Sequence, residues 1–185
     1  QTIVRARMMG IATVALIVPA GILSILLGIY PGSLVLDLLI FAVGILGTVT
    51  YAFFLYGLVP MGRAHNSRLA KTGKVFALVS LIAGIVLTLI APPFVSIELM
   101  EMIVLPVLVI AMIVFGILSI RLSKDVKEFE PALGVVAARA ALWNKIAGWL
   151  MVTIVLSFVG ALFSLVADYY MWRMQGEFLK KEPVA

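Results

Sequence analysis

Residues 8–36 read MMGIATVALIVPAGILSILLGIYPGSLVL and hold no charged side chain over 29 residues. Four further uncharged stretches follow, 38–62, 75–97, 102–120 and 146–167, and they contain 25, 23, 19 and 22 residues. A helix needs about 20 apolar residues to cross the hydrocarbon core of a bilayer. Each stretch is therefore long enough to cross once. We expect helices, because backbone polar groups in lipid must be satisfied within the segment.

The composition excludes most soluble functions. Of the 185 residues, 64% are hydrophobic and 12% are charged, and the mean hydropathy is +1.21. Soluble domains are about 45–50% apolar and about 25% charged, so a water-soluble enzyme and a nucleic-acid-binding domain are excluded. The chain has no cysteine and one histidine, His65. Thiolate metal centres and bis-histidine haem ligation are therefore impossible within the chain, and we expect no metal and no cofactor.

Turn residues divide the uncharged stretches. Tyr-Pro-Gly-Ser at 30–33 separates the first two, and Pro92-Pro93 would end the third helix, because proline donates no backbone hydrogen bond. The sequence predicts an all-α, polytopic membrane helix bundle with five transmembrane helices in a single domain, 1–185. The expected helices are 8–29, 34–59, 74–92, 98–120 and 145–172.

The basic residues gather on one side of this bundle. The N-terminus and the loops 60–74 and 121–145 hold 11 of the 14 Lys and Arg residues. The positive-inside rule places that side in the cytoplasm and predicts an N-in, C-out topology. Arg173, Lys180 and Lys181 would then lie outside.

The longest polar segment is 121–145, RLSKDVKEFEPALGVVAARAALWNK. Proline is favoured in the first turn of a helix, so a helix is expected to start near Pro131. Two interpretations stay open: an amphipathic helix on the inner membrane surface, or an extension of the fifth helix. Clustered bases near a membrane can bind anionic lipid headgroups. The candidates in the preceding loop are Arg63, Arg68, Lys71 and Lys74.

Charged residues are absent near the centres of the expected helices. Ionisable groups deep in a membrane usually mark functional sites. The carboxylates nearest to these helices are expected at their outer ends: Asp37, Glu98, Glu101 and Asp168. We interpret them as interfacial residues in water or paired with a neighbour. The alternative is an outward-facing cation or proton site.

Small residues recur at spacings that keep them on one helix face. Such faces let membrane helices approach closely. The packing candidates are Ser157, Gly160, Ala161, Ser164, Ser80, Gly84, Gly44 and Gly47.

Apolar hairpins alternate with short basic loops, as in YGLVPMGR at 56–63 followed by NSRLAK at 66–71. In this pattern the chain resembles a loose class of small archaeal and bacterial multi-pass membrane proteins of unknown function. The resemblance implies an integral protein of a prokaryotic plasma membrane. It assigns a role to no individual residue.

The soluble segments carry no phosphate-binding glycine loop, nucleophile elbow or paired catalytic carboxylates, so we expect no enzyme. The leading hypothesis is a non-catalytic accessory subunit of a larger membrane complex, such as a respiratory or other energy-converting one. Its partners would be other membrane subunits and lipids, and not nucleic acid. The alternatives are a small stand-alone transporter or channel, and a membrane assembly or signalling factor that works through 121–145.

Overall fold

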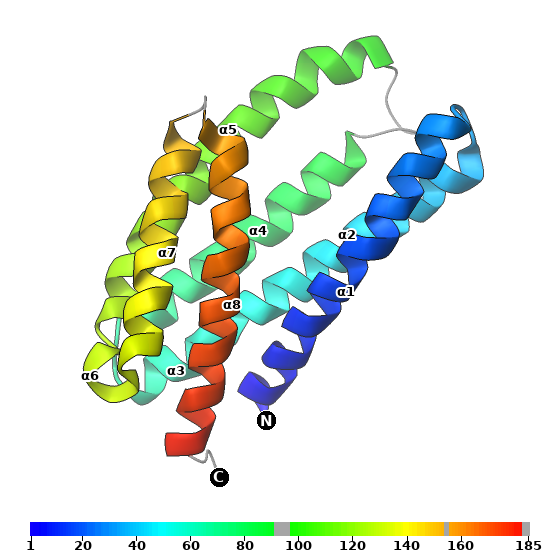
Figure 1. The fold of residues 1–185 in the computed structure, drawn as a ribbon. Coiled ribbons are helices and arrows are strands. Elements are labelled where there is room, and N and C mark those ends of the chain that lie inside the picture. Colours follow the sequence, from blue (N-terminus) through cyan, green and yellow to red (C-terminus); the bar gives the residue numbers. More distant parts are fainter. Residues whose placement is uncertain (91–96, 154–155, 183–185) are drawn as a thin grey trace.

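The computed structural model describes residues 1–90, 97–153 and 156–182 (Figure 1). This part of the chain is helical and contains no strand. The helices are α1 Thr2–Ile29, α2 Leu34–Tyr56, α3 Leu58–Ala64, α4 Leu69–Leu89, α5 Ile97–Lys127, α6 Glu130–Leu133, α7 Val135–Val152 and α8 Ser157–Lys181.

Within the described residues, four helices are long and apolar enough to cross a membrane, which indicates an integral, multi-pass membrane protein. They are α1, α2 continued by α3 to Ala64, α4, and α5 from Met102 onward. These correspond to the first four expected helices. Pro19 and Pro106 lie inside α1 and α5. Pro92 and Pro93 lie outside the described residues.

The expected single helix 145–172 is wrong. α7 ends at Val152, and Thr153 leaves the helical region with φ −82° and ψ 71°. α8 then begins at Ser157 and runs back beside α7 in the opposite direction (Figure 1). The sequence at 152–155 is Val-Thr-Ile-Val, and four successive β-branched residues weaken helix propensity. Neither Pro nor Gly marks the break.

The expected N-in, C-out arrangement assumed a single fifth helix, and the reversal before α8 instead returns the chain to the end of the bundle where α1 begins. Both termini lie at one end of the bundle, here called the inner end (Figure 1). His65, after α3, lies with its Nε2 3.0 Å from Glu182 Oε1, and Lys181 donates a hydrogen bond to the Ala132 carbonyl in α6. The end of α8 therefore lies on the same side as the loop after α3.

The 121–145 segment is mostly helical. α5 continues to Lys127, and α6 follows after a short turn. Gly134 has φ +63°, a conformation that glycine adopts without the steric cost of a Cβ, and it separates α6 from α7. Residues 135–145 belong to the same helix as 146–152 and pack against α5. Of the two interpretations, the structure therefore favours the helical extension.

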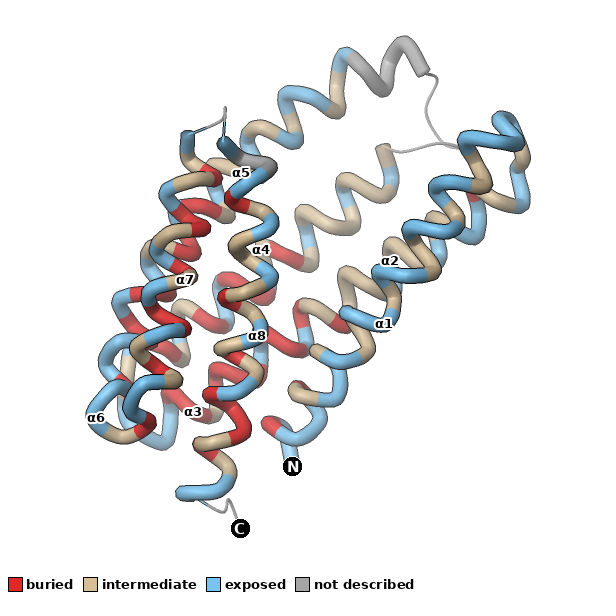
Figure 2. Tube along the Cα trace, in the orientation of Figure 1, coloured by how far each residue is buried: buried red, intermediate tan, exposed pale blue. Residues whose placement is uncertain are grey.

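Buried residues concentrate in the inner half of the bundle (Figure 2). The side chains with no exposed surface include Leu55, Leu58, Leu122 and Met174, from α2, α3, α5 and α8. In α1 only Ile3 and Ala6 are buried. Its apolar side chains face outward, as they do in a helix surrounded by lipid or by another protein.

Candidate functional site

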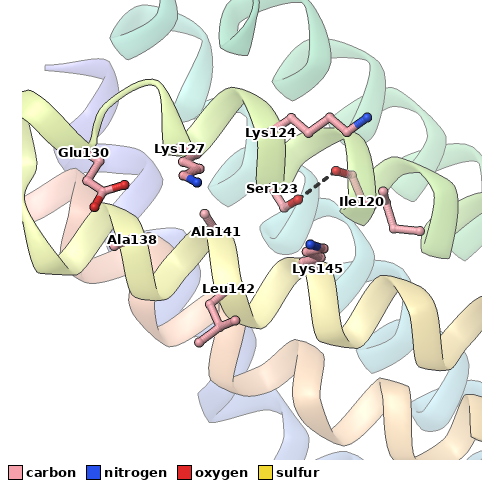
Figure 3. A pocket seen from close by; sticks show the side chains of 9 residues that line it. All are labelled: Ile120, Ser123, Lys124, Lys127, Glu130, Ala138, Ala141, Leu142 and Lys145. Atoms are coloured by element: carbon pink, nitrogen blue, oxygen red, sulfur yellow. Dashed lines mark hydrogen bonds between the residues drawn. The ribbon is translucent and has the colours of Figure 1, made fainter.

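A basic groove lies between α5 and α7 at the inner end, with a volume of about 520 Å³. Lys124 and Lys127 of α5 and Lys145 of α7 line it, together with Glu130. Figure 3 shows Lys127 and Lys145 reaching into the space between the two helices, while Lys124 extends away over α5. We call this space the α5–α7 groove.

The groove follows from residue spacing on its two walls. Lys124 and Lys127 are three residues apart in α5, which keeps them near one face. On the α7 wall the side chains between the lysines are small, Ala138 and Ala141. Methyl groups leave open the space that longer side chains would fill.

A second basic groove lies on the other side of α5, against α4. Arg68, Lys71, Arg121 and Lys124 line it with Asp125, and its volume is about 490 Å³. We call it the α4–α5 groove. Lys124 belongs to both grooves, so the two form a continuous basic surface around α5.

The bases of these grooves form no ion pair in the part of the chain that the structure describes. The ion pair found there is Lys180–Glu177 at 2.9 Å in α8, and His65 Nε2 lies 3.0 Å from Glu182 Oε1 at the end of α8. The hydrogen bond from Lys180 lowers the pKa of Glu177 below the ordinary value. The groove side chains thus present positive charge to any anion at this surface.

Two of the four lipid-binding candidates lie in these grooves. Arg68 and Lys71 line the α4–α5 groove, whereas Arg63 and Lys74 are exposed and line neither. Sequence reasoning missed the bases of α5 and Lys145 because it placed them in a loop. The three-residue spacing of 121, 124 and 127 is the signal that could have identified a helix with bases on neighbouring faces.

The expected outer carboxylates do not gather around a pocket among the described side chains. Asp37, near the start of α2, is buried, and neither groove includes it. Asp168 lies within α8 and accepts a hydrogen bond from Tyr51 Oη at 3.3 Å. Glu98 and Glu101 lie in α5, and their side chains are outside the described ones. Asp168 is therefore a packing contact between α2 and α8.

A polar contact between α1 and α8 was not expected from the sequence. The Arg7 guanidinium lies 4.3 Å from the ring centroid of Trp172, close enough for a cation–π interaction. One turn further on, Gln175 Nε2 donates to the Phe54 carbonyl at 3.2 Å. Arg7 Nε, Trp172 Nε1 and Gln175 Oε1 are buried and have no hydrogen-bond partner. This contact fixes the inner end of α8 against α1 and α2.

Most packing candidates on α2 and α4 lie in close helix contacts. A Cβ added to Gly84 would overlap the side chain of Thr48, and one added to Gly44 would lie 3.3 Å from Thr88 Cγ2. Ser80 is buried and its hydroxyl lacks a partner. Gly47 has nothing within 4 Å of such a Cβ.

The candidates on α8 face α7 at one position. A Cβ at Gly160 would lie 2.8 Å from the Met151 backbone nitrogen. Ala161 is half-buried, and Ser164 donates to its carbonyl oxygen at 2.6 Å. The side chain of Ser157 is outside the described ones.

A close contact between α5 and α7, which the sequence did not indicate, is Gly116 against Gly148. Each carbonyl oxygen would lie 2.6–2.7 Å from a Cβ on the other residue. This close approach holds α5 and α7, the two walls of the α5–α7 groove, together next to the groove.

Comparison with known proteins identifies no relative. No family model, no curated protein and no solved structure matches the chain. Function is therefore inferred from the residues and their geometry.

Proposed function

We propose that the chain is a non-catalytic accessory subunit of a larger complex in a prokaryotic plasma membrane. One observation carries the proposal: the outer part of α1 has a face of small residues that contacts no other helix among the described residues. Gly21, Ser24 and Gly28 are all exposed, and a Cβ at either glycine would meet nothing within 4 Å.

This face continues a contact made further down α1. Gly10 lies 11 and 18 residues before Gly21 and Gly28, which is about three and five helical turns, so the three share one face. A Cβ at Gly10 would lie 2.9 Å from Phe54 Cδ2, so the inner part of the face packs on α2. The outer part has no such neighbour.

Small residues in membrane helices permit close approach of another helix. Glycine weakens a helix by about 0.5–1 kcal/mol relative to alanine. Contact with lipid alone does not compensate for this destabilisation, whereas close packing of another helix does. The corresponding faces of α4, α5, α7 and α8 pack within the chain at Gly84, Gly116, Gly148 and Gly160. A helix from another subunit is the occupant we propose for α1.

The proposed orientation has both termini in the cytoplasm. The reversal before α8 moves Arg173, Lys180 and Lys181 from the expected outer side to the inner end, where α8 finishes. All 14 Lys and Arg residues then belong to inner segments. This distribution supports the positive-inside assignment better than the five-span topology did.

The test is native mass measurement of the full chain after mild detergent extraction from its own membrane. A stable complex with a different polypeptide is expected. The double variant Gly21→Leu/Gly28→Leu should lose the partner, because two isobutyl groups fill the face. Ala15→Leu adds the same group at an exposed position on another face of α1 and should retain it.

The alternatives give different results. A homo-oligomer that is insensitive to the glycine substitutions would support a stand-alone transporter or channel. A monomer that binds a soluble protein through the inner end would support an assembly or signalling factor. Either result would contradict the proposed subunit role.

A further inference from the structure

The two grooves around α5 lie where the chain changes from apolar to charged. α5 is uncharged from Met102 to Ile120, and Arg121 begins its basic end. Ile120 and Leu142 line the α5–α7 groove beside its lysines. In a protein that crosses a bilayer, such a change marks the level of the lipid headgroups.

Both grooves combine apolar and basic walls. Leu118 and Val75 line the α4–α5 groove, as Ile120 and Leu142 line its neighbour. Each groove can therefore contact a hydrocarbon chain with its apolar wall and an anion with its basic wall.

The charges of the grooves are unbalanced. Together they hold six cations against the carboxylates Asp125 and Glu130. None of the six forms an ion pair with a described residue. Like charges held close together repel, and a bound anion relieves that repulsion. The cations are Arg68, Lys71, Arg121, Lys124, Lys127 and Lys145.

The basic side chains converge on the same space, which favours a small anion with several hydrogen-bond acceptor atoms. Lys127 and Lys145 reach into one space from different helices (Figure 3). Lysine ammonium groups bind phosphate as point charges, and the guanidinium groups of Arg68 and Arg121 can bind it with two parallel hydrogen bonds. Phosphate offers several oxygen acceptors to donors that arrive from several directions.

We propose that the α5–α7 and α4–α5 grooves bind phosphate groups at the inner headgroup level, with Lys124 contributing to both. The phosphate belongs to an anionic phospholipid or to free inorganic phosphate, and the test below separates these two sources. The site is independent of the subunit interface on α1, since it uses different helices.

The experiment measures equilibrium binding to the purified full chain in a non-ionic detergent at low salt. Three probes are compared: fluorescent phosphatidylglycerol, fluorescent phosphatidylcholine and inorganic phosphate. The test variant is Lys127→Gln/Lys145→Gln. The matched control is Arg63→Gln/Lys74→Gln, which also removes two exposed charges but changes neither groove.

A basic residue near an anionic surface contributes roughly fivefold in affinity, so the double variant should weaken phosphate-probe binding about 25-fold. The control should stay within about twofold. Lys127→Arg/Lys145→Arg should retain binding, because it keeps both charges. All the substituted residues are exposed, and unchanged melting without ligand confirms that each variant is folded.

The three probes distinguish a phospholipid headgroup from free inorganic phosphate as the source of the bound phosphate. Groove-dependent binding of phosphatidylglycerol assigns the site to a phospholipid, and groove-dependent binding of inorganic phosphate alone assigns it to the free anion. Equal losses in Lys127→Gln/Lys145→Gln and in Arg63→Gln/Lys74→Gln would overturn the proposal, because the attraction would then belong to the whole basic end. Equal binding of phosphatidylcholine would also overturn it: its choline cation balances the phosphate charge, so the unpaired lysines and arginines of the grooves should bind it more weakly than phosphatidylglycerol.

Discussion

The contact between Gly116 and Gly148 gives the sharpest prediction for stability. In Gly148→Ala, the new Cβ would lie 2.6 Å from the Gly116 carbonyl oxygen and 2.9 Å from the Ile120 backbone nitrogen. Two of its close neighbours are backbone atoms, so no rotamer change relieves the overlap and α5 must move away from α7. Overpacking of this kind typically costs about 1–3 kcal/mol.

The control is Gly47→Ala, since a Cβ at Gly47 meets nothing within 4 Å. Both substitutions replace a helical glycine with alanine, so the gain in helix propensity of about 0.5–1 kcal/mol is common to both. The difference between them isolates the overlap. We expect Gly148→Ala to be less stable than Gly47→Ala by about 1–3 kcal/mol.

The assay is thermal unfolding in detergent, followed by circular dichroism. For a chain of this length, 1 kcal/mol corresponds to roughly 2–4 °C in Tm. Gly148→Ala should therefore melt several degrees below Gly47→Ala. If it melts at the same temperature or higher, α5 and α7 are not in close contact at these glycines.

Two further predictions concern the polar contacts of α8. Tyr51→Phe removes the hydroxyl that donates to Asp168 and should destabilise the bundle by about 1 kcal/mol. The control Tyr56→Phe changes an exposed ring and should not alter stability. The Tm values of the two variants, each compared with that of the unchanged protein, test this. Arg7→Gln removes the cation above the α8 tryptophan and should cost about 0.5–2 kcal/mol, measured by denaturant unfolding. Arg5→Gln removes the same charge from an exposed site, and an equal cost there would rule out the cation–π interaction.

The sequence predicts the apolar helices because charge-free length alone distinguishes a membrane span. The first four expected helices correspond to α1, α2, α4 and α5. The break before α8 was not predicted, because the turn lacks Pro and Gly and its β-branched residues are also common in membrane helices. The absence of charge over 146–167 predicts one membrane span, although this stretch contains the end of α7 and the first part of α8.

The candidate site was predicted in part. Arg68 and Lys71 are recognisable as a basic loop next to a membrane span. Lys127 and Lys145 are far apart in the sequence, and only the packing of α7 against α5 brings them to one groove. The contact of Arg7 with Trp172 likewise depends on the reversal, because a continuous fifth helix would carry that ring to the outer side.

The chain turns back after α7, and in the proposed orientation both termini and the basic residues share the cytoplasmic side. Reporter fusions after Lys71 and after Ala185 test it directly. We expect both reporters to read cytoplasmic. A cytoplasmic signal at Lys71 with an external signal at Ala185 would contradict it and restore a single continuous fifth span.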